Sequence, residues 1–199
     1  LMAFQSVKQL LERAASEHLP LWETILEDDL NSHNLTREAS LMKMQYFWEA
    51  MKTSVENYRP EDRSNSGLVG GDGEKVRIAS QEGRLFGGEF FNDVITEALK
   101  VSECNACMKR IVAMPTAGSC GVIPAVLIPL VRERALSDES IIQALYVAAG
   151  FGQIIATRSS ISGAEGGCQA EVGTASAMAA TAITYLGGGT GLMCSYACA

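Results

Sequence analysis

Apolar residues recur every three or four positions along most of this chain, which is the spacing of one buried helix face. In the first fifteen residues they are Leu1, Phe4, Val7, Leu10, Leu11 and Ala14. Comparable patterns predict helices over residues 1–15, 19–30, 36–58, 92–114, 122–136, 137–158 and 169–186. No period-two alternation of useful length and no internal repeat interrupts this pattern. The sequence therefore predicts an all-α fold.

Several residues mark the ends of these helices. Thr36 and Ser137 have the side chains of N-caps, and Pro60 is expected to close the helix before it. Pro129 lies inside the 122–136 segment, where a proline removes a backbone hydrogen bond and kinks a helix. The 169–186 segment is rich in Ala, Gly, Ser and Thr, which lets neighbouring helices approach closely, so we expect it to be central.

Residues 59–90 differ from the rest in composition, because Gly, Ser and charged residues dominate there. We interpret this segment as a long, mostly irregular loop, of the kind that is functional or mobile in a compact domain. The whole chain, residues 1–199, is expected to form one helical domain around this loop.

Composition excludes some functions and favours a compartment. The net charge is -7 and no basic cluster is present, so binding to nucleic acid is not expected. The longest nearly uncharged runs are too short to cross a bilayer, and the N-terminus does not resemble a signal peptide. Six cysteines in a chain of 199 residues, long enough to build a core without disulfides, suggest a reducing cytoplasm.

Two cysteines share one local pattern. Cys120 lies in "PTAGSCGVIP" and Cys168 in "RSSISGAEGGCQAEVG", and each follows a glycine-rich turn directly before a predicted helix. Free N–H groups at a helix start favour a thiolate. The pair therefore suits a metal cluster held by thiolates or an anionic substrate held by N–H groups. A lone cysteine beside glycine is more often a small buried apolar residue, and the duplication argues against that simpler interpretation.

The stretches "IVAMPTAGSCGVIPAVL" and "SISGAEGGCQAEVGTASAMAA" resemble the two cysteine motifs of iron-sulfur-dependent L-serine dehydratases, in their alpha subunit or alpha domain. Further similar stretches are "FQSVKQLLERA", "SNSGLVGGDGEKV" and "NACMKRIVA", so the resemblance runs from about residue 3 to about residue 189.

The resemblance implies a cytoplasmic lyase of amino-acid degradation that converts L-serine to pyruvate and ammonia. It implies a [4Fe-4S] cluster and no pyridoxal phosphate, a serine dehydratase beta subunit or domain as partner, and a homo- or hetero-oligomer. Carried over to this sequence, Cys120 and Cys168 are the cluster ligands. Thr116, Ser119 and Ser160 lie next to these motifs and are candidates to contact the substrate. The sequence assigns no general base.

The chain departs from the family pattern in three respects. Lys109 stands where the family has a small glycine. The segment that carries the family's third cluster cysteine is not present, and Cys194 is a poorly matched substitute, which indicates a truncated or divergent C-terminal end. The serine- and histidine-bearing motif of the beta subunit is also missing. We therefore expect the isolated chain to be inactive.

Other conspicuous residues have simpler interpretations. Cys104 and Cys107 form a C-x-x-C pair inside a predicted helix, and we interpret both as structural. His18 and His33 are expected to be surface or packing residues. The stretch "GLVGGDG" resembles a phosphate loop only in glycine content, because it lacks the Lys-Ser/Thr ending. Met44, Phe47, Trp48 and Met51 are expected to form a core-facing helix stripe.

Two other functions stay open from the sequence. The chain could be a non-catalytic helical fragment that serves only in assembly. It could also belong to a related cluster-dependent cysteine desulfidase. Uptake of iron by the anaerobically reconstituted protein separates the enzyme from the assembly fragment.

Overall fold

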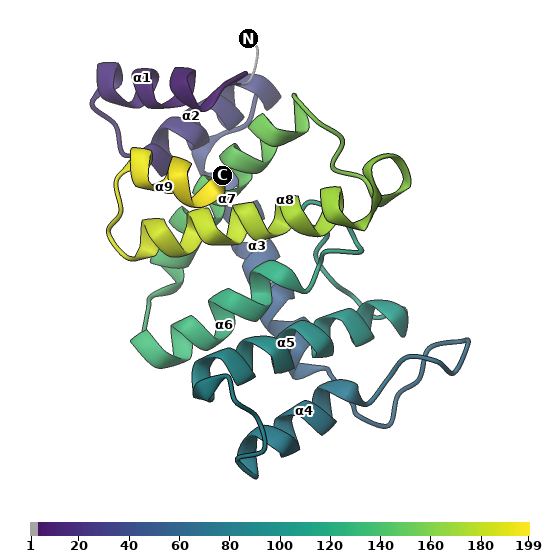
Figure 1. The fold of residues 1–199 in the computed structure, drawn as a ribbon. Coiled ribbons are helices and arrows are strands. Elements are labelled where there is room, and N and C mark those ends of the chain that lie inside the picture. The colour runs from purple at the N-terminus through teal and green to yellow at the C-terminus, as the bar shows by residue number, and fades with distance from the viewer. Residues whose placement is uncertain (1–3) are drawn as a thin grey trace. The chain divides into compact units, whose positions relative to one another are not determined.

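A computed structural model describes residues 4–199, and every regular element within that range is an α-helix (Figure 1). The all-α prediction is therefore confirmed for the described residues. The helices are α1 Val7–Glu17, α2 Leu21–His33, α3 Arg37–Glu56, α4 Asp72–Gln81, α5 Gly88–Ala106, α6 Val122–Arg134, α7 Asp138–Ala156, α8 Gly163–Leu186 and α9 Gly191–Cys198. Leu1, the first apolar position of the predicted N-terminal helix, lies outside the described residues.

The described residues group into two compact units, where we had expected one domain. Residues up to Trp48 and from Ser137 onward form the first unit, and Glu49–Leu136 forms the second. The boundary falls inside α3.

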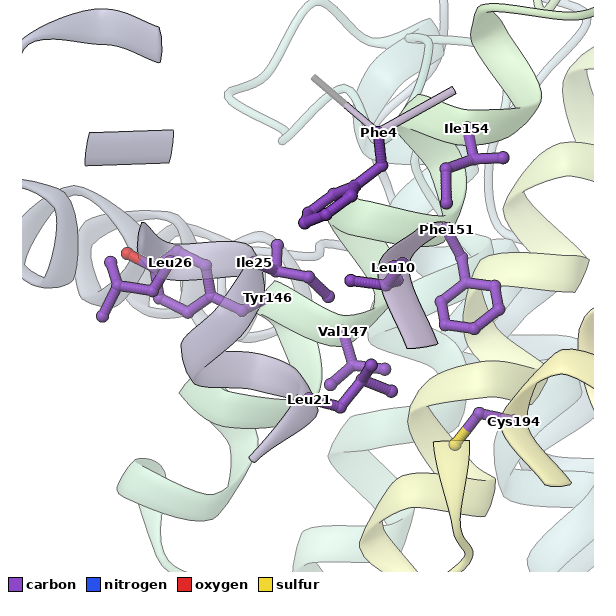
Figure 2. Close-up of a cluster of buried hydrophobic side chains, with 10 residues drawn as sticks. All are labelled: Phe4, Leu10, Leu21, Ile25, Leu26, Tyr146, Val147, Phe151, Ile154 and Cys194. Carbon is purple, nitrogen blue, oxygen red and sulfur yellow. The ribbon is translucent and has the colours of Figure 1, made fainter. Parts of the chain in front are cut away.

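In the first unit, α8 packs against both α7 and α9, and α7 also packs against α2 (Figure 1). Figure 2 shows the hydrophobic cluster of this unit, built from Phe4, Leu10, Leu21, Ile25, Leu26, Tyr146, Val147, Phe151, Ile154 and Cys194. Small residues set the close spacing. A Cβ on Gly152 would lie 2.6 Å from the Met178 sulfur, so any side chain there would force the buried Met178 to move. The central position expected for the small-residue helix agrees with these contacts.

By length and composition alone, helix α7 could cross a membrane, so the prediction that every nearly uncharged run is too short was wrong. Of the 18 consecutive residues of α7 that are most apolar, 56% are buried inside the protein. A buried core helix of a soluble protein passes the same test, so this is weak evidence for a membrane span.

The second unit is built mainly from α4, α5 and α6, with α5 packing against both others (Figure 1). Its buried side chains include Met51, Val101, Ile123 and Leu127. Helix α6 continues through Pro129 to Arg134, so the proline does not end it. The Glu97 carboxylate is buried between α5 and α6 and pairs with Arg132 at 2.8 Å.

The cap predictions are confirmed. The Ser137 hydroxyl accepts a hydrogen bond from the Ser140 N–H at 3.2 Å, and the Thr36 hydroxyl accepts one from the Ala39 N–H at 3.2 Å. The predicted stripe on α3 is confirmed in part. Trp48 and Met51 are buried, while Met44 and Phe47 are half-buried.

The segment 59–90 is not the mostly irregular loop that we predicted, because α4 occupies its centre and α5 begins at Gly88. The only buried residues of α4 are Gly73 and Ala79, so it shows no run of large apolar side chains. Two ion pairs between side chains three residues apart, Asp72 with Lys75 and Glu74 with Arg77, stabilise α4.

Two other boundaries differ from the prediction. The helix predicted over 92–114 ends at Ala106, and Met108 follows with a left-handed φ of 60°. Helix α9, which we did not predict, is capped by Thr190, whose hydroxyl accepts from the Met193 N–H at 3.3 Å.

Candidate functional site

Cys120 lies in the turn that leads into α6, in the second unit. Its N–H donates to the Ala117 carbonyl at 3.3 Å, and the Val122 N–H donates to the Ser119 carbonyl at 3.1 Å. The predicted position just before a helix start is therefore confirmed. Cys120 is buried, with 2% of its surface exposed.

Gly121 matters here for space and not for an unusual backbone conformation. Its φ is -78°, an ordinary value. A Cβ at this position would lie 2.8 Å from the Ala98 carbonyl oxygen and 3.0 Å from the Ser102 hydroxyl. The missing side chain thus lets the Cys120 turn lie directly on α5.

The structure brings Thr116 and Ser119 together beside Cys120. Their hydroxyl oxygens are 3.0 Å apart, and the Ser119 hydroxyl also donates to the Thr116 carbonyl at 3.3 Å. Ser119 is buried. Asn105, which the sequence analysis did not single out, donates from its side-chain amide to the Ala117 carbonyl at 3.0 Å and so fixes the turn to α5.

Cys168 belongs to the first unit and follows a break in α8. Gly167 has φ 76° and ψ 175°, values that interrupt the helix and that glycine adopts without strain. Cys168 therefore begins the long part of α8, as predicted, and its side chain is exposed.

The turn before Cys168 is held by Ser160 and Glu165. The Ser160 hydroxyl donates to a Glu165 carboxylate oxygen at 3.0 Å and accepts from the Ser162 N–H at 3.3 Å. Ser160 is thus part of the cysteine turn, in the same unit as Cys168, whereas Thr116, Ser119 and Cys120 lie in the other unit.

The remaining cysteines lie outside the two glycine-rich turns. The buried Cys104 thiol donates to the Ser54 carbonyl at 3.2 Å, and burial raises its pKa. Cys107 follows the last residue of α5, so the C-x-x-C pair is not wholly inside the helix as predicted. A buried, hydrogen-bonded thiol agrees with a structural Cys104.

Cys194 is fully buried in the hydrophobic cluster of Figure 2, and burial raises the pKa of its thiol. Burial also raises the pKa of Cys198. Without a bound metal, both thiols therefore lose their proton less readily than an exposed cysteine does. Within residues 4–199 no three His, Cys, Asp or Glu side chains gather as a metal site.

The glycine-rich stretch "GLVGGDG" wraps a carboxylate of its own chain. Glu103 on α5 is 4% exposed, and its oxygens accept from the N–H groups of Gly71 at 2.7 Å, Asp72 at 2.7 Å and Gly73 at 3.0 Å. These N–H groups form the start of α4, where a negative charge is stabilised. Because Glu103 already occupies this anion site, the structure disfavours a phosphate there.

Lys109, which departs from the family pattern, is accommodated at the end of α3. Its ammonium donates to the Asn57 carbonyl at 2.8 Å and pairs with Asp62. The cation thus joins the C-terminal end of α3 to the following loop, a favourable position for a positive charge.

Both histidines lie near helix ends, as expected for surface residues. His18 follows α1 with a left-handed φ of 55°, and His33 is the last residue of α2. Both are exposed. The His33 ring nitrogen Nδ1 lies 3.0 Å from a carboxylate oxygen of Asp29.

Comparison with known proteins identifies the family. A sequence profile for the serine dehydratase alpha chain matches residues 16–199. The chain belongs to this family. It is 35% identical over 187 residues to a probable L-serine dehydratase alpha chain of Bacillus subtilis, covering 94% of this chain and 62% of the relative.

Two other relatives give the same result. The L-serine dehydratase alpha chain of Peptoniphilus asaccharolyticus is 30% identical over 186 residues, covering 93% of this chain and 64% of the relative. L-serine dehydratase 2 of Escherichia coli is 31% identical over 198 residues, covering 92% of this chain and 41% of the relative. The chain thus spans less than two thirds of the length of these relatives.

Proposed function

We propose that this chain is the cluster-bearing alpha portion of an iron-sulfur-dependent L-serine dehydratase. The observation that carries the proposal is the membership in the serine dehydratase alpha chain family, over residues 16–199. The relatives from Bacillus subtilis and Peptoniphilus asaccharolyticus are named as alpha chains of L-serine dehydratases.

Cys120 and Cys168 are the proposed protein ligands of a [4Fe-4S] cluster. Two observations support this choice. Thiolates are the usual ligands of such clusters, and both cysteines lie at helix starts, where free N–H groups favour a thiolate. These two thiols do not complete a ligand set, because no three His, Cys, Asp or Glu side chains gather as a metal site within residues 4–199. The proposal therefore requires further ligands besides these two thiols.

The proposed reaction removes water from L-serine to give 2-aminoacrylate, which tautomerises to an imine and is hydrolysed to pyruvate and ammonia. A bound cluster supplies a Lewis-acidic iron for the departing hydroxide. A protein base must accept the α-proton, and the described residues do not identify it. The hydroxyls of Thr116, Ser119 and Ser160 are proposed to bind substrate oxygens, because each lies within a cysteine turn.

The test is anaerobic reconstitution of the chain with iron and sulfide, followed by addition of a serine dehydratase beta subunit. We expect pyruvate from L-serine in the mixture, little from either protein alone, and none with Cys168→Ser. A mixture that takes up no iron and makes no pyruvate would favour the non-catalytic assembly fragment. Faster release of sulfide from L-cysteine than of pyruvate from L-serine would favour a desulfidase.

A further inference from the structure

A cavity of about 130 Å³ lies in the first unit, lined by residues of α2, α3 and α7. None of its lining residues belongs to either cysteine motif. The cavity opens to solvent on one side, where the exposed Lys43 lies, and buried side chains such as Tyr146 line its inner part. The question is therefore what its lining can bind.

Three polar side chains on the lining form a connected chain of hydrogen bonds. The Ser40 hydroxyl donates to an Asp29 carboxylate oxygen at 2.6 Å, and it lies 2.6 Å from the Tyr146 hydroxyl. Ser40 has one hydrogen, which goes to Asp29, so the Tyr146 hydroxyl donates to Ser40. Ser40 is 2% exposed and Tyr146 is 3% exposed. The buried end of the cavity is thus polar and ordered.

The cavity carries one side chain of each charge. Asp29 holds a carboxylate that still has acceptor capacity, because each carboxylate oxygen accepts more than one hydrogen bond. Lys43 is exposed and therefore lies at the rim, with its ammonium 6.0 Å from the centre of the Phe47 ring. Phe47 and Ala149 supply part of the apolar lining. This combination suits a small molecule that carries both a cation and an anion.

The size of the cavity limits that molecule. An engineered protein cavity of about 150 Å³ holds benzene, which has six non-hydrogen atoms. A ligand of about six or seven such atoms therefore fits here. We propose that this cavity binds a small α-amino acid, with its ammonium group on Asp29, its carboxylate on Lys43 and a short side chain against Phe47 and Ala149. This proposal does not depend on the proposed dehydratase activity.

L-alanine is the probe of choice, because it has no β-hydroxyl and cannot undergo the proposed elimination. Titration calorimetry of the chain with L-alanine should give a dissociation constant on the order of 1 mM, as expected for so small a ligand. Acetate and methylammonium each carry only one of the two charges, and each should bind at least about tenfold more weakly.

Lys43→Gln should raise the dissociation constant at least about tenfold, and this exposed change should leave the fold intact. Ala149→Leu should fill the cavity and abolish binding, with unchanged helix content by circular dichroism. Lys75→Gln, the same change on α4, and Cys168→Ser should both bind L-alanine like the original chain. Unchanged binding by Cys168→Ser would show that L-alanine binding does not depend on the proposed cluster.

No saturable binding of L-alanine up to about 20 mM would overturn the proposal. Equal affinities in the original chain and Lys43→Gln would do so too. Binding of acetate as tight as that of L-alanine would show a simple anion site instead, and would contradict the role given to Asp29.

Discussion

Glu103→Gln is expected to destabilise the second unit, because the Glu103 carboxylate is the buried anion at the start of α4. Oε2 accepts from the Gly71 N–H at 2.7 Å, and Oε1 accepts from Asp72 and Gly73. Glutamine keeps one oxygen and places an NH₂ group toward one of these N–H donors. One charge-assisted bond is lost, a buried N–H is left without an acceptor, and the charge at the helix start disappears. Together these effects should cost about 2–4 kcal/mol.

Hydrogen exchange followed by mass spectrometry is the most direct assay, because the loss is local. A cost of about 2–4 kcal/mol corresponds to roughly 30- to 900-fold faster exchange of the amides at the start of α4. The matched control is Glu133→Gln, the same change on an exposed residue of α6, which should leave exchange unchanged. An increase below about threefold at Gly71, Asp72 and Gly73 would refute the reasoning.

Three further predictions test the fold and the thiols. Ser137→Ala should lower the free energy of unfolding in urea by about 1 kcal/mol, since α7 loses its cap, and an unchanged unfolding midpoint would count against the cap. In the cluster-free chain at about pH 8, iodoacetamide should label the exposed Cys168 before Cys104 and Cys194, because the raised pKa values of those two buried thiols leave less thiolate. Labelling of all three should accelerate at higher pH, and equal rates would contradict this order. The first tryptic cut should follow Arg84, which lies exposed in the short loop between α4 and α5, and an earlier cut within α7 or α8 would show that loop to be better protected than the core.

The sequence predicted the helices that carry large apolar residues at regular spacing, and the caps at Thr36 and Ser137. It did not predict α4, because that helix buries Gly73 and Ala79 and depends on Glu103 from another helix. The pattern of apolar residues also did not predict the division into two units. The boundary falls inside α3, where the helical periodicity continues unbroken.

The sequence also predicted only part of the candidate site. Glycines beside cysteine placed Cys120 and Cys168 at helix starts, as the structure has them. The contact of Asn105 with the Cys120 turn and the capture of Glu103 by "GLVGGDG" could not be predicted. Both join residues more than ten positions apart through side-chain geometry, about which local spacing carries no information.

Iron content after anaerobic reconstitution tests the central claim most directly. With thiol in the reconstitution buffer to complete the ligand set, the original chain should bind about four irons and absorb broadly toward the violet, as a cubane cluster does. Cys120→Ser and Cys168→Ser should each retain less than about one iron, because a hydroxyl is a poor ligand for a soft cluster. Cys104→Ser, the same change at a buried structural thiol, should retain the full amount. Equal iron in all the variants would contradict the assignment of Cys120 and Cys168 as cluster ligands.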